Sequence, residues 1–176
     1  MSKYKQFVVD INTLNKIMKK GLKEIKLGLG LGNLKFGMSR SEVKLFLGEP
    51  TNIDRFSYTD SNEDLTETWE YEDSNLSLSF DEEEDWKLLL ISVTSNFYQL
   101  QGKNLIGLEK PTLIEELQKI NFGTIHIEDC SENDSENTEV IEFEEKSLNL
   151  WLNDGVLDEI QWSPFFIDDD TIKWPD

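Results

Sequence analysis

The sequence predicts an α+β fold made of two tandem repeats, each a short helix packed on an antiparallel sheet of three to four strands, with an added N-terminal helix. Two observations lead to this prediction. Residues 66–80 and 138–152 are similar, with six of fifteen positions identical, and each segment is preceded by signals for the start and end of a helix. With 176 residues and 38% hydrophobic side chains, the chain is long and apolar enough for a sizeable core.

The two similar segments are predicted to be β-hairpins. Each alternates polar and apolar residues, passes through a short polar linker, and then alternates again. A third strand is expected after each hairpin, at residues 87–93 in the first repeat and 156–162 in the second.

A short helix is expected before each hairpin. In the first repeat, Ser39 and Glu42 form a capping box, and Gly48 followed by Pro50 ends the helix. In the second, Pro111 lies in the first turn and Gly123 ends the helix.

The N-terminal segment is basic. Residues 1–26 hold seven lysines against two acidic residues, and helical spacing after Asp10 predicts an amphipathic helix ending near Gly21. This helix either packs on the acidic remainder of the chain or contacts a membrane or nucleic acid. The glycine-rich residues 28–32 do not match a nucleotide-binding loop and predict a flexible turn.

We therefore divide the chain into residues 1–30, the basic helix and turn; 31–98 and 99–165, the two repeats; and 166–176, an acidic tail.

Composition excludes several functions. There are 36 Asp and Glu against 17 Lys and Arg, which gives a net charge of −19. We therefore expect a basic partner and do not expect direct binding to DNA or RNA. A single cysteine and a single histidine exclude a disulfide and a site of several Cys or His ligands. The start of the chain shows neither a signal peptide nor a membrane span, so we expect a cytoplasmic protein.

Catalytic and metal-binding patterns are weak. Residues 60–64 begin like a calcium loop, but Leu65 stands where the loop needs glycine. Cys130 lies among Glu128 and Asp129, which should raise the pKa of its thiol rather than activate it. We expect no enzyme activity, no metal and no cofactor, and a ligand-dependent enzyme is only the third hypothesis.

Strand alternation predicts two faces. Apolar residues on the inner face should pack against the helices, and polar residues should face outward. Trp151 interrupts the polar outer pattern and is either an interface anchor or covered by the N-terminal helix or the tail. The residues that we expect to bind a partner are Glu70, Glu72, Glu82, Glu83, Trp86, Glu142, Glu144, Asn149 and Trp151.

Residues 37–50, Gly-Met-Ser-Arg-Ser-Glu-Val-Lys-Leu-Phe-Leu-Gly-Glu-Pro, resemble the signature of the small outer-membrane assembly lipoproteins of the SmpA/OmlA type. The tandem arrangement resembles the β-lactamase inhibitor protein fold. No lipobox cysteine is present, and the second repeat lacks the Gly-x-Pro ending, so a lipoprotein role is not implied. The resemblance implies a protein-binding module that covers its partner with an open sheet face.

Charge, repeat and resemblance together favour an acidic immunity or inhibitor protein that neutralises a basic toxin, most plausibly a bacterial nuclease, by covering its active-site surface. The alternative is a general adaptor or envelope-assembly-like interaction module without a toxin partner.

Overall fold

The predicted hairpins are present in the computed structural model of the chain, which describes residues 21–57, 64–132, 137–168 and 171–176. Each hairpin closes through one turn of 3-10 helix, η1 (Glu72–Ser74) in the first repeat and η2 (Glu144–Lys146) in the second. Asn75 and Ser147 follow these turns in the left-handed conformation, with φ of 48° and 47°. The two repeats therefore share one turn geometry as well as a sequence pattern.

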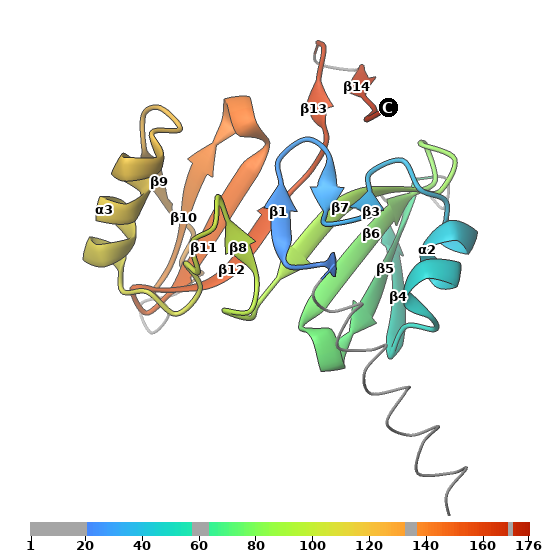
Figure 1. The fold of residues 1–176 in the computed structure, drawn as a ribbon, viewed down its shortest axis with the longest axis horizontal. Coiled ribbons are helices and arrows are strands. Elements are labelled where there is room, and N and C mark those ends of the chain that lie inside the picture. The colour runs from blue at the N-terminus through green and yellow to red at the C-terminus, as the bar shows by residue number, and fades with distance from the viewer. Residues whose placement is uncertain (1–20, 58–63, 133–136, 169–170) are drawn as a thin grey trace, which may run out of the picture.

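All long strands belong to one eight-stranded antiparallel sheet with the order β4-β5-β6-β7-β12-β11-β10-β9 (Figure 1). The third strand of each repeat has the predicted bounds. The strands are β4 (Asn52–Ser57), β5 (Leu65–Tyr71), β6 (Leu76–Asp81), β7 (Lys87–Val93), β9 (His126–Asp129), β10 (Thr138–Phe143), β11 (Leu148–Asn153) and β12 (Val156–Trp162).

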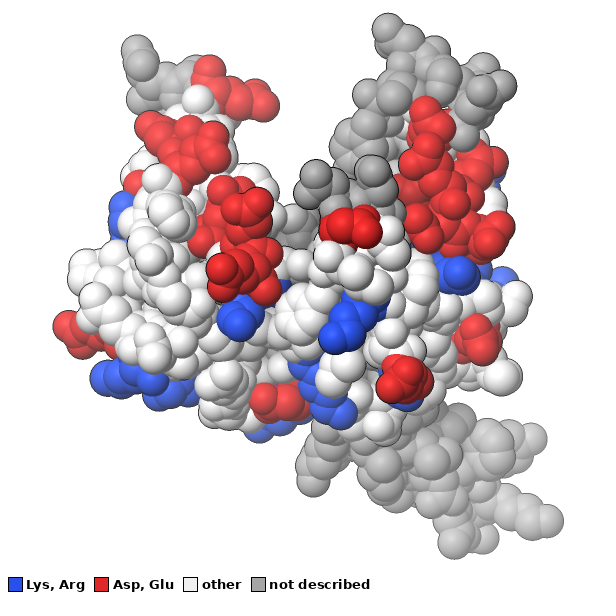
Figure 2. Space-filling view, turned by 90° about the horizontal axis from the view of Figure 1, so that it is seen from above, with Lys and Arg blue, Asp and Glu red and all other residues white. Residues whose placement is uncertain are grey.

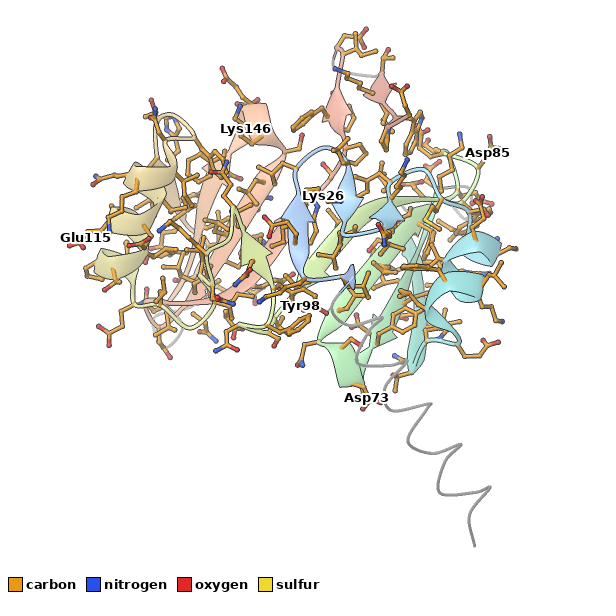
Figure 3. All side chains as sticks on the ribbon, in the orientation of Figure 1. Lys26, Asp73, Asp85, Tyr98, Glu115 and Lys146 are labelled. Carbon is orange, nitrogen blue, oxygen red and sulfur yellow. The ribbon has the colours of Figure 1, made fainter. Side chains whose placement is uncertain are left out.

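The two halves of the sheet are related by an approximate two-fold axis. Strand β7 pairs antiparallel with β12, its counterpart in the other repeat, and Ser92 lies opposite the equivalent Gln161 at the centre of the junction. Figure 3 shows the consequence: Lys146 in η2 and Asp73 in η1, which belong to equivalent turns, lie at the upper and the lower edge of the molecule in this view. The axis therefore passes close to the Ser92–Gln161 pair.

The predicted fold class is wrong. The structure is mostly β, and its central element is one continuous sheet rather than a helix with its own three- or four-stranded sheet in each repeat. The physical reason is that separate sheets would leave β7 and β12 as edge strands with unpaired backbone groups, and their mutual pairing removes both edges. The added N-terminal helix was expected over residues that lie, apart from its end at Gly21, outside the described residues.

Within the described residues the α-helices are short: α2 (Arg40–Leu47) and α3 (Lys110–Ile120). Helix α2 begins with the predicted capping box of Ser39 and Glu42. The backbone segments that lead into α2 and α3 make equivalent contacts. Gly37 N, before α2, donates to Leu88 O at 3.0 Å, and Gly107 N, before α3, donates to Leu157 O at 2.8 Å. Figure 1 shows the helices in front of the two ends of the large sheet.

The glycine-rich residues 28–32 were predicted to be one flexible turn. The structure instead has turns on both sides of a short strand, Gly30–Leu31, which belongs to a small second sheet of order β3-β2-β1-β8. Its strands have two or three residues each, too short for alternation to show in the sequence. Trp162 Nε1 donates to Gly30 O at 3.2 Å and fastens this sheet to the large one. The strands are β1 (Glu24–Lys26), β2 (Gly30–Leu31), β3 (Leu34–Lys35) and β8 (Gln99–Leu100).

The core lies between the inner face of the large sheet and the layer formed by α2, the small sheet and α3. Every residue assigned to the inner face of the two hairpins is buried, which confirms the predicted phase. Those residues are Trp69, Tyr71, Leu76, Leu78, Phe80, Ile141, Phe143, Leu148, Leu150 and Leu152.

The segment predicted as an acidic tail contains a second small hairpin. Strands β13 (Phe165–Phe166) and β14 (Ile172–Lys173) pair antiparallel, and Ile167 N donates to Thr171 O at 2.8 Å. Figure 1 shows this C-terminal hairpin projecting beyond the end of the large sheet. We call the described residues of this hairpin, 165–168 and 171–173, the C-terminal arm.

Candidate functional site

The outer face of the large sheet carries two equivalent hollows, one in each repeat. The first hollow has a volume of about 230 Å³ and is lined by Glu70, Glu72, Asn75, Leu76, Ser77, Ser92 and Thr94. The second hollow has about 540 Å³ and is lined by Glu142, Glu144, Ser147, Leu148, Asn149, Gln161, Ser163, Leu90, Trp162 and Phe166. The first seven residues of the second list are the repeat equivalents of the first list, in the same order.

A central hollow of about 320 Å³ joins the other two across the two-fold axis. It shares Glu70 and Ser92 with the first hollow, and Leu90 and Gln161 with the second. It adds Glu159, which brings the carboxylates on this surface to five. We call the three hollows together the acidic face, and none of their lining residues is a Lys or Arg.

Short side chains form the floor of the acidic face. Ser77 Oγ donates to Glu70 Oε1 at 2.8 Å, Thr68 and Ser79 share a hydrogen bond of 3.0 Å, and the Ser92 hydroxyl donates to Glu159. These bonds hold Glu70 and Glu159 in place without neutralising them. The face therefore combines fixed negative charge with hydroxyl and amide groups that can still exchange hydrogen bonds with a partner.

Acidic side chains also gather in groups elsewhere on the surface, and Figure 2 shows several of these groups from above. Glu82 and Glu83 belong to one such group, in the turn between β6 and β7. The charge of Asp64, a hydrogen bond with it and the charge of Asp81 raise the pKa of Glu83. Glu82 Oε2 accepts from Leu65 N at 3.2 Å, so part of its carboxylate serves the turn. This turn and η1 lie at opposite ends of β6, so the structure does not bring these two residues to the first hollow.

Trp86 packs against the inner core rather than on the acidic face. Its ring lies beneath two cations, with the guanidinium carbons of Arg40 and Arg55 at 4.2 Å and 5.4 Å from the ring centroid. The structure therefore separates Trp86 from the predicted binding residues that line the acidic face, because its side chain helps to hold α2 against β4.

Glu67, which the sequence analysis missed, is the centre of that contact. It is only 4% exposed, and its carboxylate accepts from Trp69 Nε1 at 2.7 Å, from Arg40 Nη1 at 3.1 Å and from Arg55. Burial alone raises the pKa of Glu67, but hydrogen bonds from Arg55 and Trp69 and the charges of both arginines outweigh it and lower the pKa overall.

The second repeat carries an equivalent ion pair. Lys110, the first residue of α3, contacts Glu139 of β10 at 2.6 Å, just as Arg40, the first residue of α2, contacts Glu67 of β5. In each repeat the pair joins the start of the helix to the sheet. The sequence alignment of the repeats contained both acids, but only the fold shows what they contact.

Trp151 lies on the outer side of β11, half-buried, opposite Val140 and Glu159 on the neighbouring strands. Val140 has the outward phase of its strand but is only 2% exposed. Trp151 lies outside the lining of the second hollow, which does contain Glu142, Glu144 and Asn149 as expected.

The residues that complete the acidic face, Ser92, Glu159, Gln161 and Phe166, were not predicted. Glu159 and Gln161 stand at alternating positions of segment 156–162, which was a signal for these two residues, whereas segment 87–93 is apolar except for Lys87 and Ser92 and gave no such signal. Leu90 lies opposite Ser79, on the same side of its strand as Ser92. The β-bulge between Ser79 and Phe80 then turns Leu88 inward, which alternation alone does not predict. Phe166 reaches the second hollow only through the C-terminal arm.

Cys130 is a free thiol whose pKa is raised, by burial first and then by the charges of Glu128, Glu142 and Asp129, as the sequence predicted in direction. Among the described residues no group of three His, Cys, Asp or Glu side chains could hold a metal ion. Most of the calcium-like segment 60–64 lies outside those residues.

Among the described residues, no helix is long and apolar enough to cross a membrane. Comparisons of the chain with protein-family models, with curated proteins and with solved structures find no match. The arrangement of the acidic face is therefore the basis for a functional conclusion.

Proposed function

We propose that this chain is an acidic protein-binding module that covers the basic surface of a protein partner with its acidic face. The specific form of the proposal is an immunity or inhibitor protein that neutralises a basic toxin, most plausibly a nuclease, in the cytoplasm. A nuclease must present cations to the phosphate backbone of its substrate, so its active-site surface is complementary to an anionic face.

The observation that carries the proposal is the pair of equivalent acidic hollows joined by a third. The three hollows are lined by Glu70, Glu72, Glu142, Glu144 and Glu159 and by no Lys or Arg. Like-charge repulsion in such a surface costs stability, whereas a cationic partner converts it into attraction and faster association.

The apolar side chains of the hairpins supply a second argument. The inner face of the large sheet already packs against the helices and the small sheet, so the outer face is not needed to bury the hairpins' apolar residues. The two repeats meet at the Ser92–Gln161 pair, which makes their outer faces one continuous surface. A continuous, polar and hollowed surface suits a convex partner rather than a small apolar ligand.

The test begins with capture. The tagged chain is used to capture proteins from a lysate of its own organism, and bound proteins are identified by mass spectrometry. We expect a basic protein, whose association rate with the purified chain falls as salt rises and whose nuclease activity the chain blocks at equimolar ratio. Failure to recover a basic protein contradicts the proposal, as does binding that is the same at low and high salt.

Charge reversal then locates the surface. The variant Glu142→Lys/Glu144→Lys should slow association at low salt by about tenfold or more, because the steering charge is inverted. The matched control Glu49→Lys/Glu115→Lys changes the net charge equally at exposed positions outside the hollows, and should retain most of the rate. Equal losses in both variants would show that net charge matters and the acidic face does not.

A further inference from the structure

The two hollows differ in one respect that their sequence equivalence does not explain. The second hollow is more than twice as large, about 540 Å³ against about 230 Å³, and it alone includes a side chain from the C-terminal arm, Phe166. The arm has no counterpart in the first repeat, so it makes the acidic face asymmetric.

The base of the arm is firmly packed. A Cβ on Gly28 would come within 2.5 Å of the Phe165 ring, so this ring lies directly on the glycine backbone of the small sheet. At the other end, the Trp174 ring lies against Gly37, and Lys87 Nζ is 5.1 Å from its centroid. The residues at the two ends of the hairpin, Phe165 and Trp174, are thus held against the body of the protein.

Two apolar side chains of the arm are exposed. Phe166 is 50% exposed and Ile167 is 68% exposed, although Phe165, the preceding residue, is packed on the small sheet. Neighbouring residues of a strand point to opposite sides, so packing Phe165 inward turns Phe166 toward the second hollow. Exposed apolar side chains on a fixed support are favoured as binding anchors, because little conformational entropy is lost when a partner covers them.

We infer that the C-terminal arm supplies an apolar contact to the partner. The second hollow then binds a partner segment that carries a Lys or Arg beside an exposed apolar side chain. This inference rests on the proposed function. The cation fits the carboxylates of Glu142 and Glu144, which line the hollow without any basic residue, and the apolar side chain covers Phe166. A polyanion such as a nucleic acid is disfavoured by the same carboxylates.

The experiment uses a phage-displayed library of random twelve-residue peptides selected against the full chain. Wild type should enrich peptides in which a Lys or Arg lies near an aromatic or branched aliphatic residue. The variant Phe166→Ser/Ile167→Ser should bind these peptides about tenfold more weakly, as expected for loss of an apolar anchor, while still selecting Lys and Arg. Leu45→Ser, at an exposed leucine of α2 that is 90% exposed, is the matched control and should bind as wild type does.

The outcomes separate the two proposals. Enriched peptides with Lys or Arg but no apolar preference, or equal binding to the arm variant, overturn the arm inference and leave the proposed function standing. Peptides without Lys or Arg, or binding unchanged in Glu142→Gln/Glu144→Gln, overturn the proposed function; no enrichment overturns both.

Glu70→Gln/Glu72→Gln, the same change in the first hollow, should affect arm-dependent peptides less, and an equal effect contradicts the asymmetry. A circular dichroism melt of each variant verifies folding, and Phe166→Asp alone gives a second disruption of the apolar anchor.

Discussion

Replacing Glu67 by Gln tests whether the buried carboxylate joins α2 to the edge of the sheet. Glutamine keeps the size of the side chain but removes its charge, and its amide cannot accept from Trp69 Nε1 and both arginines together. Whichever way the amide is oriented, its NH₂ group faces another donor. The perturbation therefore breaks the network without creating a cavity.

The expected loss follows from the exposure of the partners. Removing one partner of a fully buried ion pair costs about 3–5 kcal/mol. The Arg40 and Arg55 side chains are 32% and 53% exposed, so water compensates part of the loss. We expect unfolding free energy to fall by about 2–3 kcal/mol, or a Tm lower by about 5–10 °C for a chain of this length.

The control is Glu139→Gln, the equivalent substitution in the second repeat. Glu139 contacts the single cation Lys110, with side chains that are 19% and 30% exposed, so the expected loss is about 1 kcal/mol or less. Urea unfolding followed by tryptophan fluorescence measures both variants. Equal losses, or a loss for Glu67→Gln below about 1 kcal/mol, would refute the network argument.

Two further predictions concern acid stability and the arm. Because the pKa of Glu67 is lowered on folding, its charge stabilises the protein above its ordinary pKa of 4.5, and this contribution is lost as pH falls through the folded value. The stability gap between wild type and Glu67→Gln should therefore be constant from pH 7 to about pH 5 and narrow below about pH 4; a gap that widens in acid would contradict the lowered pKa. For the arm, Gly28→Ala should cost about 1–2 kcal/mol and speed amide exchange at Ile167, because φ is +71° and the new methyl displaces the Phe165 ring. Gly102→Ala, with φ of +75° and nothing within 4 Å, has the backbone strain alone, and exchange at Ile167 that is equally fast in both variants would show that Gly28 does not anchor the arm.

Local patterns predicted the elements of each repeat well, because their causes are local. Alternation placed Leu78 and Leu150 in the core, and Ser39 with Glu42 predicted the start of α2. The same alternation placed Glu70 and Glu142 on one outer face. It could not assign Trp86 to a contact with Arg40, because that contact joins a turn to a helix 46 residues earlier in the chain.

The sequence by itself determined the repeat, the phase of its strands and the excess of negative charge, since periodicity and composition are properties of short segments. Only the tertiary structure decided that β7 pairs with β12, which turns two sheets into one and an α+β prediction into a mostly β fold. The same pairing brings Ser92 beside Gln161 and joins the hollows of the two repeats. Backbone pairing between distant strands depends on which edges remain unsatisfied after local folding, and no segment of the sequence contains that information.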